Sequence, residues 1–354
     1  MSRKISMSQA INEAMAMAMR KDENVILMGE DVAGGAEVDH LQDDEAWGGV
    51  LGVTKGLVQE FGRDRILDTP IAEAGYMGAA MAAASTGLRP IAELMFNDFI
   101  GSCLDEVMNQ GAKFRYMFGG KAQVPVTIRT MHGAGFRAAA QHSQSLYALF
   151  TSIPGLKVVV PSSPYDAKGL LLSAIEDNDP VIFFEDKTLY NMVGEVPEGY
   201  YTIPIGKAEI KRKGSDLTIV AIGKQVHTAM EAAEKLISKG IEVEIVDPRS
   251  LSPLDEESIL NSVAKTNRLI VIDEANPRCS VATDIAALVA DKGFDTLDGP
   301  IKRITAPHTP VPFSPPLEDI YLPTSEKVIQ VVSELLGEPS IRHKVEGKTR
   351  LMKL

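Results

Sequence analysis

The sequence predicts an α/β protein with two doubly wound domains, and three observations lead to this fold class. Short apolar strands alternate with segments of helical periodicity, which is typical of parallel sheets with helices on both faces. The alternation runs through residues 1–186 and resumes over 216–337. The stretch between them, 187–215, contains Pro197, Pro204 and several glycines, and is interpreted as a domain linker. A length of 354 residues also favours two domains rather than one.

The first domain is expected to open with an amphipathic helix. Ile11, Met15, Ala18 and Met19 fall at helical spacing, and Ser8 is a candidate N-cap. Expected strands follow at 24–32, 88–96, 124–131, 155–163 and 180–185, and expected helices at 72–86, 98–120 and 163–179.

The second domain repeats this pattern on a smaller scale. Its expected strands are 216–223, 241–248 and 268–274, and its expected helices are 225–239, 255–264 and roughly 280–292. Residues 306–316 are too rich in proline for a helix or a central strand. The acidic stretch 29–45 and the basic tail 338–354 are interpreted as solvated surface, with a subunit contact as the alternative.

Composition excludes several classes of function. The net charge of −12 disfavours nucleic acid as a partner, because phosphate binding needs a basic surface. Two distant cysteines, Cys103 and Cys279, suggest a reducing compartment, and we expect a cytoplasmic protein. The sequence contains no apolar run long enough for a membrane span, no phosphate-binding P-loop, no zinc-type spacing and no G-x-S-x-G motif.

One glycine motif resembles a dinucleotide-binding loop. Gly133, Gly135 and Ala138 approximate G-x-G-x-x-A after an expected strand. A dinucleotide site needs an acid at a strand end about 20 residues later, and residues 138–163 contain no Asp or Glu. We therefore interpret these glycines as allowing a loop to run close against another part of the protein.

Two residues stand out as candidates for proton transfer. His142 follows the glycine-rich loop, and its neighbours Gln141, Ser143 and Gln144 could fix one tautomer of the imidazole. Glu73 interrupts the small, apolar run 68–86. A carboxyl group buried there would be suited to give and take a proton near neutral pH, although an acid at a helix N-terminus can also simply complement the helix dipole.

Several longer motifs occur together and in order, namely LDTPIAEAG, GLRPIAE, AKFRYMFGG, AAQHSQS and PGLKVVVPSSPYDAKGLLLSAIEDNDPVIFFE. With them, the chain closely resembles the beta subunit of the first component of 2-oxo acid dehydrogenase complexes, which are thiamine-diphosphate enzymes related to transketolase. The resemblance continues from IPIGKAEI to EDIYLP. It implies a transketolase-like pyrimidine-binding domain followed by a transketolase C-terminal-type domain.

The resemblance also implies roles for individual residues. Glu73 corresponds to the glutamate that hydrogen-bonds a ring nitrogen of the cofactor's aminopyrimidine, and Phe99 to the aromatic residue against that ring. His142 corresponds to the histidine that assists proton transfer and passage of the acyl group to a lipoyl arm. Glu30 is a candidate for orienting the region of Glu73. A structural potassium ion is implied at Val126, Ala174, Ile175, Asp177 and Asp179.

A missing motif implies a partner. This chain has no G-D-G motif, with which related enzymes bind the cofactor's diphosphate and its Mg²⁺. The resemblance therefore implies an alpha subunit that binds the diphosphate half, in an alpha2beta2 heterotetramer, and a lipoyl-bearing acyltransferase component as a further partner.

The expected substrate rests on a departure from pyruvate-type beta subunits. Residues 33–57 form an insertion that contains Trp47, the only tryptophan, and this insertion is similar to that of bacterial acetoin dehydrogenase beta subunits. It implies cleavage of acetoin and transfer of the acetyl group to lipoamide. Pyruvate or a branched-chain 2-oxo acid is the alternative substrate. A catalytically idle scaffold and a free-standing transketolase-like enzyme are the other hypotheses.

Overall fold

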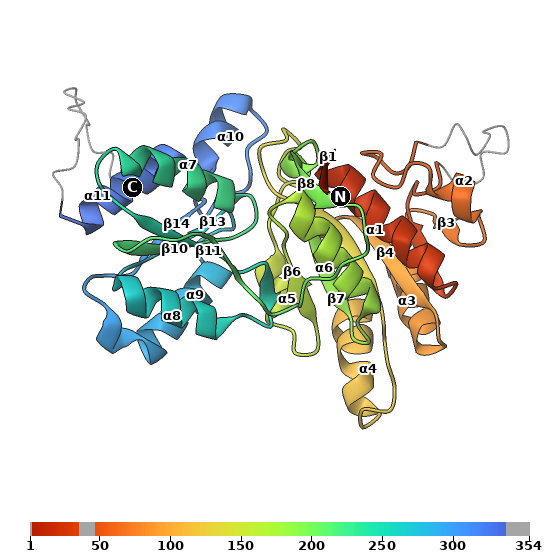
Figure 1. Cartoon of the computed structure of the whole chain (residues 1–354). Helices are drawn as coiled ribbons and strands as arrows, with labels where there is room; N and C mark the ends of the chain where they lie inside the picture. The colour runs from red at the N-terminus through yellow and green to blue at the C-terminus, as the bar shows by residue number, and fades with distance from the viewer. Residues whose placement is uncertain (1, 35–46, 338–354) are drawn as a thin grey trace, which may run out of the picture.

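A computed structural model describes residues 2–34 and 47–337, which form two lobes side by side (Figure 1). Residues 35–46 of the insertion at 33–57 and the whole basic tail lie outside the described residues. Each lobe is built on its own mainly parallel sheet, as the alternation of strands and helices predicts. Among the described residues, no helix is long and apolar enough to cross a membrane.

The first lobe contains a seven-stranded sheet. Its strands lie in the order β12 (Ser250–Ser252), β6 (Lys157–Val159), β7 (Val181–Asp186), β5 (Thr127–His132), β4 (Arg89–Phe96), β2 (Val25–Gly29) and β3 (Ile66–Asp68). All neighbours pair in parallel except β12, which is antiparallel to β6. Because β12 comes from the second half of the chain, this pairing ties the two lobes together.

Helices cover both faces of this sheet. On one face, α1 (Met7–Lys21) packs against α6 (Pro164–Glu176), near α2 (Leu57–Phe61). Ser6 rather than Ser8 caps α1, because its side chain accepts from the Gln9 amide while the Gln9 side chain accepts from the Ser6 amide. The other face carries α3 (Glu73–Ser85) and α5 (Tyr147–Thr151).

The expected helix over 98–120 is divided into three pieces. They are the 3₁₀-helix η2 (Asn97–Ser102), the π-helix η3 (Glu106–Gly111) and α4 (Ala112–Met117). Gly111 lies so close to α3 that a Cβ there would be 2.8 Å from Met81 Sδ. Close packing against Met81 of α3 therefore accompanies the irregular backbone, and hydrophobic periodicity alone does not reveal it.

The second lobe contains a five-stranded sheet in the order β14 (Lys302–Thr305), β13 (Leu269–Asp273), β10 (Leu217–Ala221), β11 (Val243–Asp247) and β9 (Glu209–Arg212). Only β9 is antiparallel to its neighbour. In Figure 1, α7 (Gln225–Ile237) and α11 (Ser325–Leu335) lie above this sheet, with α8 (Glu256–Thr266) and α9 (Val281–Lys292) below it. A further short helix, α10 (Pro315–Tyr321), starts at the end of the proline-rich stretch.

The stretch 187–215 is more regular than its composition indicates. It contains η4 (Lys187–Leu189), β8 (Val193–Pro197) and the edge strand β9. The partner of β8 is β1 (Ser2–Ser6), nearly 200 residues away, and the two pair antiparallel. Neither strand has an apolar pattern of its own, since most of their residues are exposed or half-buried. Only the long-range pairing makes them strands.

A buried arginine links three strands of the first sheet. Arg129 on β5 is almost fully buried and donates from Nη1 to Glu93 Oε2 on β4 at 2.7 Å. On its other side, Nε and Nη2 donate to the two carboxylate oxygens of Glu185 on β7, at 2.6 and 2.9 Å. Tyr190 completes the group by donating its hydroxyl to Glu185 Oε2 at 2.6 Å. Adjacent parallel strands thus carry a buried, hydrogen-bonded ion cluster.

Arg129→Met is expected to destabilise the chain by about 3–5 kcal/mol, because it leaves two carboxylates buried without their cation. The measurement is urea unfolding followed by circular dichroism. Arg20→Met is the matched control, since Arg20 pairs with Glu60 at the surface and such pairs contribute at most about 1 kcal/mol. Equal losses for the two variants would contradict this account of the cluster.

Candidate active site

The carboxyl ends of the parallel strands in the first lobe bring the predicted site residues to one edge of the sheet. Glu30 directly follows β2, Phe99 lies in η2 after β4, and His142 lies in the loop after β5. Glu73 is the first residue of α3. Ligand sites of open parallel sheets form at this edge, so the topology supports the interpretation of these residues as one site.

Three aromatic rings meet at His142. Its imidazole contacts the Phe96 ring at a centroid distance of 4.7 Å and the Phe99 ring at 5.4 Å, both edge to face. The two phenyl rings contact each other at 5.6 Å. The sequence analysis identified Phe99 and His142 but missed Phe96, although its place as the last residue of the strand before Phe99 could have indicated it. Together the rings form an apolar wall beside a titratable group.

The loop that carries His142 is fastened to the residues just before Phe99. The buried Asn97 side chain accepts from the Leu146 amide at 2.9 Å and donates to the Gln144 carbonyl at 2.9 Å. Asp98 Oδ1 accepts from the Gln144 side chain at 2.9 Å. Gln144 therefore anchors the loop through Asp98, and the imidazole is held by the phenyl rings described above.

The environment of Glu73 differs from the expectation. Glu73 is half-buried rather than enclosed in an apolar slot, and the preceding Ile71 is 84% exposed. The buried face of α3 begins only at Tyr76, and the small residues of the first turn are too short to cover the carboxyl group. The expectation that Glu73 is buried within its apolar run is therefore wrong.

Glu30 is a buried carboxyl group at this edge. Its side chain is only 6% exposed, and Oε1 has no hydrogen-bond partner. Burial, reinforced by the negative charges of Glu73, Asp31 and Glu93, raises the pKa of Glu30 to about 6. Since the charge of Glu73 acts on Glu30, the two carboxyl groups lie in one electrostatic environment, as the suggested orienting role of Glu30 requires.

The predicted potassium ligands lie close together but already have protein partners. Lys157 Nζ contacts both carboxylate oxygens of Asp177, at 2.7 and 2.6 Å, and Arg115 Nη1 donates to Asp179 Oδ1 at 2.7 Å. The carbonyl groups accept as well: Val126 from Val181 N, Ala174 from Asp177 N and Ile175 from Arg89 Nε. This donor set is neutralised by the protein's own cations, and no contact supports potassium here, which stays a prediction.

The structure confirms that the glycine-rich loop after β5 runs close against other parts of the protein. Gly133 and Gly135 have φ of 93° and 100°, a region that glycine adopts without strain. A Cβ on Gly133 would lie 2.7 Å from Asp186 Oδ2 and 2.9 Å from Glu274 Oε1. The loop therefore runs against carboxylates from both lobes.

Each of the two lobes matches a known domain family. The transketolase pyrimidine binding domain family matches residues 3–193, and the transketolase C-terminal domain family matches 206–328. The acetoin:2,6-dichlorophenolindophenol oxidoreductase subunit beta of Bacillus subtilis (strain 168) is 81% identical over 96% of this chain and 100% of its own length. The chain belongs to the dehydrogenase beta subunits of the transketolase type. This membership confirms the predicted fold class and the predicted resemblance.

Other members of this beta-subunit family are more distant. The subunit of the same name from Cupriavidus necator is 61% identical over 93% of this chain and 96% of its own length. The pyruvate dehydrogenase E1 component subunit beta of B. subtilis is 43% identical over 94% and 98%. A solved split gene transketolase, an inactive beta4 tetramer, has 21% identity and a TM-score of 0.73 over 94% of this chain and 98% of its own, which shows the fold alone.

The residues at this edge of the first sheet fit the pyrimidine half of thiamine diphosphate. An aminopyrimidine needs a carboxyl group facing its ring nitrogen and an apolar surface against its ring. Glu73 offers the carboxyl group, the unpartnered Oε1 of Glu30 adds an acceptor, and Phe96 and Phe99 offer the apolar surface. These residues therefore suit a flat, polar heterocycle, which they would contact from one side.

Glu30→Gln should show how much the buried carboxylate of Glu30 lowers the free energy of unfolding. Because folding raises the pKa of Glu30 from 4.5 to about 6, the folded chain binds this proton more tightly, and the wild type loses stability as the pH rises through that window. The variant should be more stable than the wild type by about 2 kcal/mol near pH 7.5, with a smaller difference near pH 5.5.

Urea unfolding of both proteins across this pH range measures the difference. Glu234→Gln, at an exposed position on α7, is the matched control and should change stability by no more than a few tenths of a kcal/mol at any pH. A stability difference between Glu30→Gln and the wild type that does not vary with pH would contradict the assignment.

Proposed function

We propose that this chain is the beta subunit of a thiamine-diphosphate-dependent enzyme that cleaves acetoin and transfers the acetyl group to lipoamide on an acyltransferase component. The observation that supports acetoin most strongly is the 81% and 61% identity to two subunits named for acetoin oxidation. The beta subunits named for pyruvate and 2-oxoisovalerate reach 43% and 40%. Pyruvate is the second candidate, since those relatives cover nearly the same length.

The site residues suggest a division of work on the pyrimidine side. Glu73 would hold the cofactor's pyrimidine by a hydrogen bond, with Phe99 and Phe96 excluding water from the ring. When bound, thiamine diphosphate supplies a nucleophilic carbon for attack on the substrate's carbonyl group. His142, wedged against the two phenyl rings, would hold or release a proton at its imidazole nitrogen.

An alpha subunit would complete the site. The first turn of α3 is open to solvent around Glu73, and Ile71 projects into solvent beside it. At the tip of α4, which extends out of the first lobe in Figure 1, Tyr116, Met117 and Phe118 are 87%, 72% and 53% exposed. Exposed apolar groups of this kind mark protein contacts. We place the diphosphate and its Mg²⁺ on that partner, in an alpha2beta2 assembly in the cytoplasm.

A turnover assay on the reconstituted alpha–beta enzyme tests the substrate. With thiamine diphosphate, Mg²⁺ and dichlorophenolindophenol as electron acceptor, kcat/KM for acetoin should exceed that for pyruvate by at least about tenfold, a difference of ~1.4 kcal/mol in transition-state binding. A preference for pyruvate would replace acetoin with the second candidate, and a preference for 2-oxoisovalerate would replace it with that branched-chain acid. Absence of turnover with all three substrates would instead favour a catalytically idle scaffold.

Glu73→Gln in the same enzyme tests the pyrimidine contact. The amide keeps the shape of the side chain but cannot exchange the proton, so kcat should fall by roughly 10²-fold or more. Cofactor affinity, measured by calorimetry, reports the hydrogen bond separately from turnover. Glu234→Gln serves as the control and should retain full activity. An unchanged kcat in Glu73→Gln would refute the role of Glu73.

A further inference from the structure

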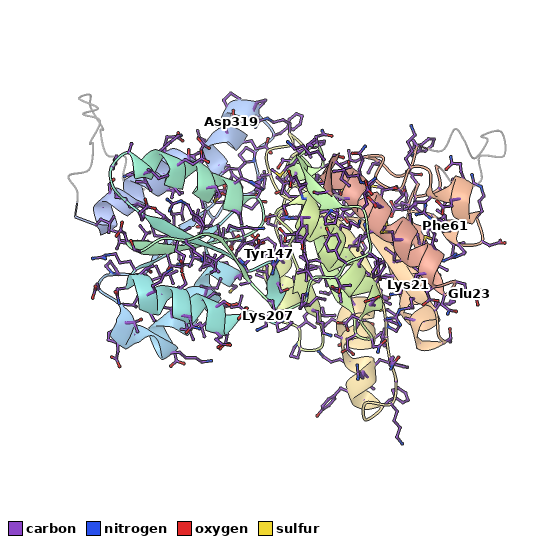
Figure 2. All side chains as sticks on the ribbon, in the orientation of Figure 1. Lys21, Glu23, Phe61, Tyr147, Lys207 and Asp319 are labelled. Carbon is purple, nitrogen blue, oxygen red and sulfur yellow. The ribbon has the colours of Figure 1, made fainter. Side chains whose placement is uncertain are left out.

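The loop that carries His142 lies at the junction of the two lobes. It comprises residues 133–146, between β5 and α5. Tyr147, the residue that follows it, lies between the lobes in Figure 2. Asn97 and Asp98 hold the loop from the first lobe, as described above. The second lobe holds it independently at both of its ends.

At the start of the loop, a carboxylate of the second lobe accepts hydrogen bonds from two backbone amides of the loop. Glu318 on α10 is fully buried, and its Oε1 accepts from the Gly135 amide at 2.6 Å. Its Oε2 accepts from the Arg137 amide at 3.2 Å and from Arg137 Nη1 at 2.8 Å. Carboxylates that accept several such donors form strong, charge-assisted hydrogen bonds. The contact therefore fixes this end of the loop on α10.

At the other end, Asp273, the last residue of β13, and Glu274, which follows it, each accept a hydrogen bond from a side chain of this region. Ser145 Oγ donates to Glu274 Oε1 at 2.5 Å. The buried Tyr147 hydroxyl donates to Asp273 Oδ1. Ser145 lies only three residues beyond His142, so these contacts restrain the backbone segment that carries the histidine.

Glu274 is itself held by a lysine. Lys224 Nζ lies 2.5 Å from Glu274 Oε2 and 3.4 Å from Asp186 Oδ2. Glu274, Asp186 and His132 are all buried, and their potential ligand atoms lie within 4.8 Å of one another, as in a metal site. The ammonium group of Lys224 already pairs with both acids, so we interpret the cluster as an internal ion-pair network that fixes Glu274 rather than as a metal centre.

The loop backbone needs such support. Arg137 and Ala139 have φ of 60° and 59°, in the left-handed region that costs residues with a Cβ roughly 1 kcal/mol or more each. Conformations of this kind persist only where the surroundings impose them. The contacts of Glu318 on one side of these residues and of Glu274 on the other provide that constraint.

We propose that Glu274 and Glu318 are positioning residues through which the second lobe fixes His142 for catalysis. The inference rests on the role proposed for His142 and extends it, because it gives the second lobe a part in the reaction without contact to substrate or cofactor. Glu274 acts through the Ser145 hydroxyl, and Glu318 acts through the backbone of Gly135 and Arg137.

Ser145→Ala in the reconstituted alpha–beta enzyme is the first test, because it removes the hydrogen bond to Glu274, together with the contact between Ser145 Oγ and His132 Nδ1, but keeps the Glu274–Lys224 pair. We expect kcat for acetoin to fall about tenfold while KM changes by less than about twofold. Ser145→Thr, which retains the hydroxyl, should recover most of kcat. Glu256→Gln, which breaks a surface ion pair with Lys292 in the second lobe, is the control and should alter neither kcat nor KM. A rise in KM with unchanged kcat would overturn the proposal.

A double variant separates positioning from general damage. If Ser145 acts through His142, then Ser145→Ala should cause no further loss of kcat in a His142→Ala enzyme, because coupled residues are not additive. A full, additive loss would overturn the proposal. Normal turnover by His142→Ala alone would refute the proposed role of His142, and with it the positioning.

Hydrogen exchange provides a readout without turnover. In the full-length chain, alone and in the assembled enzyme, the amides of residues 141–146 should exchange about tenfold faster in Ser145→Ala and in Glu318→Gln than in the wild type. Unchanged protection in both variants would overturn the proposal. Faster exchange without any change in kcat would refute positioning while leaving the proposed function intact.

Discussion

The polar edge of the first sheet depends on the buried guanidinium of Arg129. Parallel strands place their carboxyl ends side by side. In this chain Glu30 and Glu185 lie at or next to those ends, and Glu93 lies further inside β4, level with the last residue of β2. Buried carboxylates destabilise a fold unless a cation and hydrogen bonds accompany them. Arg129 binds Glu93 on one side and Glu185 on the other, so that a concentration of acids can exist where a ligand site is needed.

Glu30 and Glu73 lie outside the Arg129 cluster and remain available for a ligand. Glu30 has an unpartnered oxygen and Glu73 faces partly into solvent. The aromatic wall of Phe96, Phe99 and His142 provides the apolar component. A site with acids and rings but without a diphosphate-binding motif is incomplete by itself, which agrees with membership in a family of beta subunits.

Local patterns in the sequence predicted the two lobes and the central strands, because buried parallel strands and amphipathic helices have strong periodicities. Motif resemblance, rather than periodicity, predicted the roles of Glu73 and His142. What the sequence could not predict depends on distant segments. The pairing of β1 with β8, the addition of β12 to the first sheet and the contact of Ser145 with Glu274 all join residues far apart in the chain. The exposure of Glu73 was mispredicted because an apolar run does not reveal which chain covers it.

The central claim is that this chain holds only one half of a cofactor site. Isothermal calorimetry of thiamine diphosphate with Mg²⁺, on the full-length chain alone and on its complex with the alpha subunit, tests it most directly. The account predicts binding by the complex that is at least about 100-fold tighter, a difference of ~2.7 kcal/mol. Tight, Mg²⁺-dependent binding by the chain alone would contradict it.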